Sequence, residues 1–167
     1  WGLGEIRINC GSRIPAQGFV GDRSYSDGSK AYEVTEASGD NNSIYSTYRA
    51  FSSEGYYDVL ISDGSTVDVN LYMSEPKYTS PNERIFRVDV NGVQAPATVD
   101  LYAMNESSPT KIHIPKVDPD DDDMIRIQFS PLKGDAIVNA IEVPPFRFKS
   151  YSYTLQIFTT SFVYDDD

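Results

Sequence analysis

Short segments in which apolar and polar residues alternate recur along most of the chain. Clear examples are residues 5–10, 66–72 and 84–90. A period of two puts every second side chain on the same face of an extended strand, whereas no segment shows the 3.6-residue apolar period of an amphipathic helix. The pattern therefore predicts an all-β fold, an antiparallel β-sandwich of two sheets. Further strands are predicted at residues 44–51, 56–61, 98–103, 111–114, 124–129 and 137–143.

A hairpin is expected where one of these segments runs into Asn91-Gly92 and Val93 follows. Asparagine and glycine accept the positive φ angles of a type I′ turn more readily than other residues do. The strands on the two sides of this dipeptide are therefore expected to pair with each other in an antiparallel ladder.

The chain is acidic and has the size of a single domain. Its 167 residues include 25 Asp and Glu against 14 Lys and Arg, which gives a formal net charge of −11. Affinity for nucleic acids and for anionic membrane surfaces comes from Lys and Arg, so this balance argues against both as partners. No apolar run approaches the roughly 20 residues that a transmembrane helix needs, and no membrane span is expected.

Two adjacent prolines, Pro144-Pro145, mark the end of the predicted β domain. Tandem prolines cannot enter the interior of a sheet, because they lack the backbone N–H groups of a ladder. We therefore divide the chain into a β-sandwich domain of residues 1–143 and a C-terminal extension of residues 144–167. The extension closes with three aspartates, residues 165–167.

The C-terminal extension contains one more predicted strand, with four apolar residues that alternate with polar ones. An aromatic strand without a partner promotes aggregation, so we expect this strand to pair. Three alternatives remain: it is donated to a neighbouring copy by β-augmentation, it completes its own sandwich, or it begins a further domain. Donation from head to tail would build an open filament. The side chains expected in that contact are Tyr151, Tyr153, Leu155, Ile157, Phe158, Phe162 and Tyr164.

The start of the chain and two glycosylation patterns, together with abundant Ser, Thr and Tyr, predict a secreted, extracellular glycoprotein. The chain begins with Trp1 rather than Met, as expected of a chain that is processed after synthesis. Asn41 and Asn105 each open an Asn-X-Ser acceptor pattern for N-glycosylation, and both are expected to be exposed. Cys10 is the only cysteine, so an internal disulfide and a cysteine-based metal site are excluded.

The chain offers few groups for catalysis or metal binding. His113 is the only histidine, and neither a nucleophile nor an orienting acid accompanies it in the sequence. The acidic run of residues 118–123 lacks the ligand spacing of a calcium loop and is expected to be a solvated turn. We expect no enzymatic activity, no cofactor and no metal site.

Six sequence blocks resemble, in order, the malectin and malectin-like domain. Together they span about residues 6–143 and leave the C-terminal extension outside the family pattern. The blocks are residues 8–12 (INCGS), 21–28 (GDRSYSDG), 44–49 (IYSTYR), 69–75 (VNLYMSE), 84–92 (RIFRVDVNG) and 139–143 (NAIEV).

The resemblance implies a two-sheet β-sandwich of jelly-roll type that binds carbohydrate without catalysis. In this family, aromatic side chains and an acidic group at one end of the sandwich contact the sugar. Aromatic faces stack on the apolar face of a sugar ring, and carboxylates accept its hydroxyl protons. Tyr25 and Tyr78 match aromatic positions of the family, and Asp135 lies beside the position of its acidic contact.

Two functions from different classes remain open. The C-terminal extension favours a non-enzymatic structural glycoprotein that assembles with copies of itself into a filament, which is the interpretation we prefer. The alternative is a malectin-type carbohydrate-binding module whose partner is a glycan. Two further aromatic positions of the family are occupied by Lys77 and Ala50, with Phe51 one place late, and this weakens the alternative.

Overall fold

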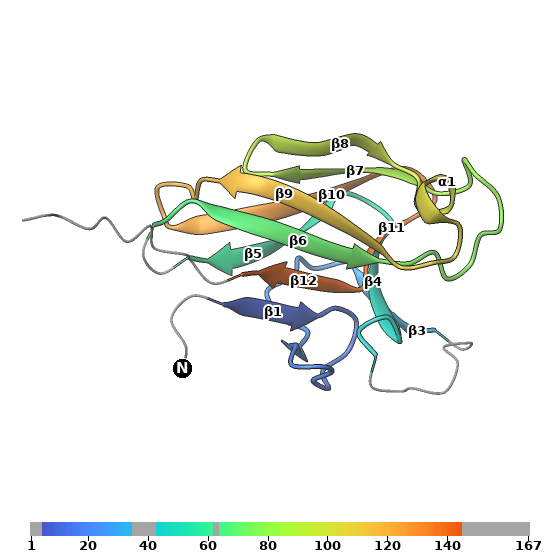
Figure 1. Cartoon of the computed structure of the whole chain (residues 1–167), viewed down its shortest axis with the longest axis horizontal. Helices are drawn as coiled ribbons and strands as arrows, with labels where there is room; N and C mark the ends of the chain where they lie inside the picture. Colours follow the sequence, from blue (N-terminus) through green and yellow to red (C-terminus); the bar gives the residue numbers. More distant parts are fainter. Residues whose placement is uncertain (1–4, 35–42, 62–63, 145–167) are drawn as a thin grey trace, which may run out of the picture.

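Two sheets pack face to face and form the predicted β-sandwich (Figure 1). The structure is a computed structural model that describes residues 5–34, 43–61 and 64–144. The first sheet contains, in spatial order, β2 (Val20–Gly21), β1 (Ile6–Asn9), β12 (Ala140–Val143), β6 (Val67–Met73) and β9 (Thr110–Val117). The second contains β5 (Gly55–Leu60), β10 (Met124–Lys133), β7 (Ile85–Val90) and β8 (Val93–Val99). The short β1–β2 pair is parallel, and the other pairs in these two sheets are antiparallel.

Alternation along the strands builds the core between the two sheets. On β10, Ile125, Ile127 and Phe129 are fully buried, whereas Arg126 and Gln128 between them reach solvent. Strands β5, β7 and β9 alternate in a similar way, and the inward side chains of both sheets merge into one cluster. Burial of each large apolar side chain is worth about 1.5–3 kcal/mol, so this cluster fixes the two sheets against each other.

The β7–β8 hairpin turns at Asn91-Gly92, as predicted. The φ angles of these residues are 45° and 82°, both in the left-handed region that the turn requires. The side chain of Asn91 also ties the turn to β10, because its Nδ2 donates to the carbonyl of Met124 and its Oδ1 accepts from the N–H of Arg126.

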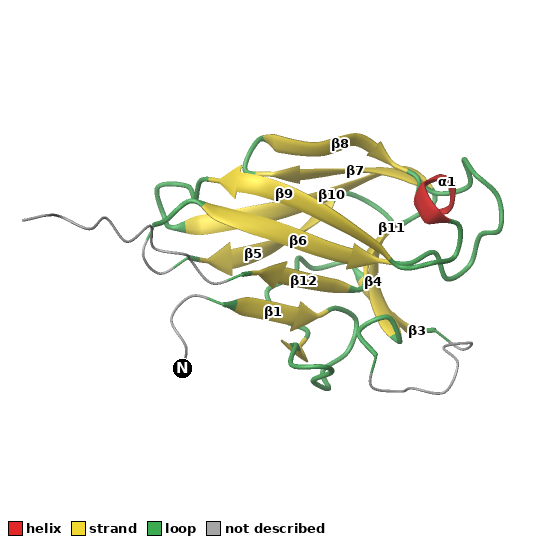
Figure 2. Ribbon diagram, in the orientation of Figure 1, coloured by secondary structure: helices red, strands yellow, loops and turns green. Residues whose placement is uncertain are grey.

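A third, smaller sheet stands at one end of the sandwich in addition to the two predicted ones. It contains β11 (Ala136–Val138), β4 (Thr47–Phe51) and β3 (Lys30–Glu33), in that spatial order. Figure 2 shows β4 and β3 at the right-hand end, below α1 and the loops that join the long strands. Strand β3 is the edge of this sheet among the described residues, and all of its residues are exposed. This end of the molecule therefore combines loops with an open strand edge.

The prediction of a strand over residues 98–103 is wrong. Strand β8 ends at Val99, and α1 (Leu101–Asn105), the one helix within the described residues, begins after Asp100. A carboxylate oxygen of Asp100 accepts a hydrogen bond from the N–H of Ala103 at 3.0 Å and so caps the first turn. A helix of five residues is too short to display a helical period in the sequence.

The single strand predicted over residues 137–143 is in fact two strands, β11 and β12, in different sheets. The chain changes sheet at Asn139, whose side chain is fully buried. Its Nδ2 donates to the carbonyl of Thr47 at 2.8 Å, and its Oδ1 accepts from the N–H of Ser74 at 2.9 Å. Asn139 therefore ties the small sheet to the loop after β6.

Strand β12 lies inside the five-stranded sheet, between β1 and β6, and its last residue Val143 pairs with Ile6.

The C-terminal extension beyond residue 144 and the acceptor Asn41 lie outside the described residues, so what the sequence predicts for them stays a prediction. In the part of the chain that is described, no helix has the length and hydropathy needed to cross a membrane.

Candidate functional site

A buried ion pair holds the loops together at the end of the sandwich near β3 and β4. Glu75, just after β6, and Arg84, just before β7, are each 4% exposed. The Arg84 Nε donates to Oε2 of Glu75 at 2.7 Å, and Nη2 donates to Oε1 at 3.2 Å. The same Oε1 accepts the backbone N–H groups of Lys77 and Tyr78, each at 3.1 Å, and Arg84 Nη1 donates to the carbonyl of Asp135 at 2.6 Å. This network fixes the position of Tyr78.

Beside this ion pair lies a cavity of about 610 Å³ with aromatic walls. The guanidinium of Arg84 lies 5.0 Å from the ring centroid of Tyr78. Across the cavity, the ring of Tyr48 stacks on that of Tyr32, with centroids 5.3 Å apart and planes at 15°. We call this cavity the tyrosine pocket, and its lining includes Glu33, Val34, Tyr48, Glu75, Lys77 and Tyr78.

The pairing register of the small sheet places two tyrosines side by side, so that their rings stack. Tyr32 of β3 lies directly opposite Tyr48 of β4, and residues opposite each other in an antiparallel pair share a face. Tyr32 keeps 40% of its surface exposed. Burial raises the pKa of the Tyr48 hydroxyl, so this group is protonated at neutral pH and can donate a hydrogen bond.

The tyrosine pocket offers chemistry that suits a hydroxyl-rich ligand. Its aromatic rings provide flat apolar surface, and the ammonium of Lys77 and the hydroxyl of Tyr48 can donate hydrogen bonds. A concave site with apolar walls and a few polar groups is typical of a small-ligand site.

The structure brings two of the three sequence-predicted site residues close together. Tyr78 and Asp135 both lie against Arg84, which faces the ring of Tyr78 and donates to the carbonyl of Asp135. Tyr25 lies elsewhere, with its ring 3.3 Å from the guanidinium carbon of Arg49. Because neighbouring residues of a strand point to opposite faces, Tyr25 over Arg49 lies across the small sheet from Tyr48 and the tyrosine pocket.

Tyr25 covers a second ion pair rather than a pocket. Arg49 Nη2 and Nε lie 2.6 and 2.7 Å from Oδ2 of Asp22, and both side chains of this pair are less than 10% exposed, at 7% and 1%. The other carboxylate oxygen of Asp22 accepts the hydroxyl of Tyr57 at 2.8 Å. The ring of Tyr25 packs on this network and on Tyr57, so its contacts are those of a structural residue.

Three residues of this region, Tyr32, Tyr48 and Glu33, were not predicted as site residues. Their proximity depends on the pairing of β3 with β4, and β3 has no apolar period that would mark it as a strand. Phe51, the aromatic residue one place late in its block, is buried and stacks on Phe129 with ring centroids 5.1 Å apart. It therefore belongs to the core.

His113 lies on β9, away from these pockets. Its Nδ1 is 2.9 Å from Oδ1 of Asn70, and its Nε2 is 3.7 Å from a carboxylate oxygen of Asp68. Both ring nitrogens thus face oxygen acceptors. No group of three or more potential metal ligands occurs among the residues that the structure describes.

The family profile of the malectin domain matches residues 5–142, which is most of the chain. The chain belongs to the malectin family. A solved complex of the plant peptide RALF23 with FER and LLG2 contains a similar fold, with a TM-score of 0.70 and 18% identity over 86% of this chain. The extracellular domain of ANXUR1 from Arabidopsis thaliana has a TM-score of 0.65 and 19% identity over 83% of this chain. At these identities the likeness shows the fold alone.

This malectin domain is shorter than the proteins that it resembles. It covers 49% of the matched chain in the RALF23 complex and 47% of the ANXUR1 chain, about half of each. A β-glucuronidase from Bacteroides uniformis shares the fold at a TM-score of 0.63 and 17% identity, over 86% of this chain but only 18% of its own. No curated protein sequence matches the chain significantly.

Proposed function

We propose that this malectin domain is a non-catalytic carbohydrate-binding module and that a sugar occupies the tyrosine pocket. The stacked pair of Tyr32 and Tyr48 beside Tyr78 is the observation that carries the proposal. Stacking holds the Tyr48 ring in place, and the carboxylate of Glu75 holds the backbone of Tyr78. Aromatic surface that is already ordered loses little conformational entropy when a ligand binds.

The module acts outside the cell in this proposal. Asn105 is exposed at the end of α1, where an oligosaccharyltransferase can reach an acceptor asparagine. One similar structure is an extracellular domain, that of ANXUR1. Both observations support a secreted or cell-surface glycoprotein.

The proposed role is binding rather than catalysis. Acyl transfer by a triad needs a nucleophile within hydrogen-bond reach of the histidine, and glycoside hydrolysis needs two carboxylates that flank the substrate. The ring nitrogens of His113 lie against Asn70 and Asp68, neither of which is a nucleophile of a triad. In the tyrosine pocket, Glu75 is bound to Arg84, and this leaves Glu33 as the one exposed carboxylate among its described lining residues.

Binding of the protein to an array of neutral and acidic oligosaccharides tests the proposal. We expect Tyr78→Ala to weaken binding about tenfold or more, because it removes the aromatic surface of the pocket. Tyr56→Ala is the matched control, since Tyr56 lies on β5 under Arg126 and lines neither pocket near β3. Absence of glycan binding by the wild-type protein, or equal binding by Tyr78→Ala, would refute the proposal.

A second candidate function is self-assembly through the C-terminal extension. It is supported by the place of β12, which is flanked on both sides by strands of its own sheet. A strand formed by the alternating residues that follow in the sequence, such as Tyr153 and Ile157, would therefore find no free position beside β12 in its own sheet. Donation of this segment to the sheet edge of another copy would give a head-to-tail filament.

Electron microscopy of the full chain and of a chain that ends at Val143 tests this candidate. We expect filaments from the full chain and monomers from the shortened one. The full-length double variant Tyr153→Lys and Ile157→Lys should also fail to assemble, because two charges would enter an apolar contact. Equal assembly of all three proteins would rule out donation of the extension.

A further inference from the structure

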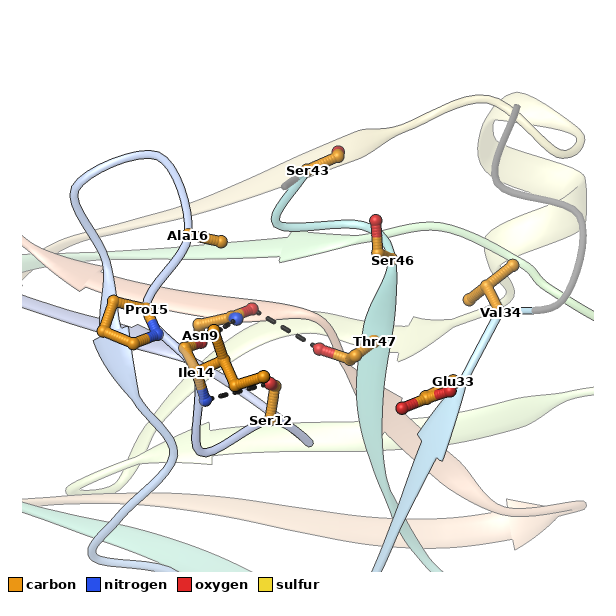
Figure 3. Close-up of a pocket in the computed structure, with 10 residues that line it drawn as sticks. All are labelled: Asn9, Ser12, Ile14, Pro15, Ala16, Glu33, Val34, Ser43, Ser46 and Thr47. Atoms are coloured by element: carbon orange, nitrogen blue, oxygen red, sulfur yellow. Dashed lines mark hydrogen bonds between the residues drawn. The ribbon is translucent and has the colours of Figure 1, made fainter. Parts of the chain in front are cut away.

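A second cavity, of about 310 Å³, lies on the other side of the β3–β4 pair. Figure 3 shows Glu33 and Val34 on one side of it and the loop with Ser12 and Ile14 on the other, with Thr47 of β4 between them. Ser43 and Ser46 complete its polar rim. We call this cavity the hydroxyl pocket, and it shares Glu33 and Val34 with the tyrosine pocket.

The two pockets meet at the open edge of the small sheet. Tyr32 pairs with Tyr48, and the next residue Glu33 pairs with Thr47. Successive side chains of a strand point to opposite faces, so the tyrosine pocket with Tyr48 and the hydroxyl pocket with Thr47 lie on opposite faces of the β3–β4 pair. No described strand pairs with the outer edge of β3. A chain-like ligand can therefore pass from one pocket to the other around Glu33.

Hydrogen bonds hold the loop of the hydroxyl pocket in place before any ligand binds. The side chain of Asn9 is buried, and its Nδ2 donates to the carbonyl of Ile14 at 2.9 Å. The Ser12 hydroxyl accepts the N–H of Ile14 at 3.1 Å, and Thr47 Oγ1 donates to the carbonyl of Cys10 at 2.9 Å. These bonds present Ile14 at the rim with 74% of its surface exposed, the largest fraction of any large apolar residue in the described structure.

The composition of the hydroxyl pocket selects for a neutral ligand rich in hydroxyl groups. Its polar lining consists of serine, threonine and asparagine side chains with the carboxylate of Glu33, and none of its described lining residues is Lys or Arg. An anionic group would meet Glu33 within a protein of net charge −11. The exposed Ile14 offers apolar surface to the carbon-bound hydrogens of a sugar ring.

We propose that the hydroxyl pocket is a second subsite for one neutral oligosaccharide, which also fills the tyrosine pocket and crosses the open edge of β3 at Glu33. This inference rests on the proposed carbohydrate binding and adds the class of ligand to it. Affinity then depends on the length of the oligosaccharide, because only a chain of several sugar units reaches both pockets.

Titration of arrayed neutral oligosaccharides, from disaccharides to octasaccharides, tests the second subsite. The wild-type protein should bind the long members about tenfold more tightly than the short members of the same series. Ile14→Ala should weaken binding of long members about fivefold and leave short members unchanged, because only long chains reach the rim of the hydroxyl pocket. Leu60→Ala is the matched control, since Leu60 is a 58% exposed residue on β5 outside both pockets.

The charge of Glu33, which lines both pockets, gives a readout of the ligand's charge class. Glu33→Gln keeps the shape of the side chain and should improve binding of uronic-acid oligosaccharides several-fold relative to neutral ones of equal length. Wild-type binding without length dependence, or an equal effect of Ile14→Ala on short and long members, would overturn the second subsite and leave the proposed function intact. Failure of the wild-type protein to bind any oligosaccharide would overturn both.

Discussion

Arg84 and Glu75 form a bidentate ion pair that is almost completely removed from solvent, with N–O distances of 2.7 and 3.2 Å. The pair connects the chain after β6 to the chain before β7. Because Glu75 also accepts the N–H groups of Lys77 and Tyr78, the same carboxylate positions the aromatic wall of the tyrosine pocket. Stability and the proposed ligand binding therefore depend on one buried contact.

Arg84→Met should lower the free energy of unfolding by about 3–5 kcal/mol, because it leaves the carboxylate of Glu75 buried without its partner. Urea denaturation measures the loss. The exposed pair of Arg126 and Asp58 provides the control, since the Arg126 side chain is 49% exposed and Arg126→Met should cost at most about 1 kcal/mol. Equal losses in the two variants would contradict a dominant role for burial.

Substitutions of Tyr25 and Tyr78 should separate effects on stability from effects on oligosaccharide affinity. Tyr25→Leu removes the ring that covers the guanidinium of Arg49, and we expect it to lower the free energy of unfolding by about 1–2 kcal/mol while oligosaccharide affinity stays unchanged. Tyr78→Leu should lower oligosaccharide affinity and cost less stability than Tyr25→Leu, because the Tyr78 ring lies farther from its guanidinium, 5.0 Å from that of Arg84. Denaturation curves and oligosaccharide titrations of both variants test the assignment, and a loss of affinity in folded Tyr25→Leu would return Tyr25 to the binding site.

The alternation of apolar and polar residues predicted the large sheets because each of their strands buries one face. Ile125, Ile127 and Phe129 on β10 show the relation directly. The same rule could not find the small sheet, since all residues of β3 are exposed and its conformation comes from pairing with β4. It also missed α1, whose cap at Asp100 is a local signal without an apolar period.

Site residues could be predicted from the sequence only through the resemblance to the malectin family. The family resemblance pointed to Tyr25, Tyr78 and Asp135. The structure places Tyr78 and Asp135 against Arg84, but Tyr25 against Arg49. The stacking of Tyr32 on Tyr48 requires the β3–β4 register, and a slip of β3 by one residue would turn the Tyr32 ring to the face opposite Tyr48. Sequence pattern alone does not determine that register in a strand without a buried face.

Asn105 should carry an N-linked glycan when the protein is made in a eukaryotic secretory host. It is exposed at the end of α1. Its Nδ2 donates one hydrogen bond, to the carbonyl of Pro109, and the amide nitrogen carries a second hydrogen that the glycan can replace. Intact-mass measurement before and after enzymatic deglycosylation detects the glycan. Asn105→Gln should remove one glycan mass, and an unchanged mass in this variant would show that Asn105 is not an acceptor.

The protein should lose stability at alkaline pH, where the Tyr72 hydroxyl loses its proton. Burial, together with the hydrogen bond and the negative charge of Glu142, raises the pKa of Tyr72 from 10.0 to about 12, and the hydroxyl lies 2.7 Å from Oε2 of Glu142. The folded state then keeps this proton at pH values where the unfolded state has released it. The stabilisation by Tyr72 is thus complete below about pH 10 and is lost as the pH rises through about 12.

Urea denaturation at about pH 9 and about pH 11 measures this loss, and Tyr72→Phe should show a smaller decrease between the two conditions than the wild-type protein. Glu142→Gln removes the charge next to the phenol, so the pKa of Tyr72 should move down towards its ordinary value in a tyrosinate absorbance titration. Glu142→Gln also breaks the ion pair with Arg7 at all these pH values, so the dependence on pH, rather than the absolute stability, is the quantity to compare. An identical pH dependence in the wild-type protein and in Tyr72→Phe would show that other tyrosines, such as the buried Tyr57, account for the alkaline loss.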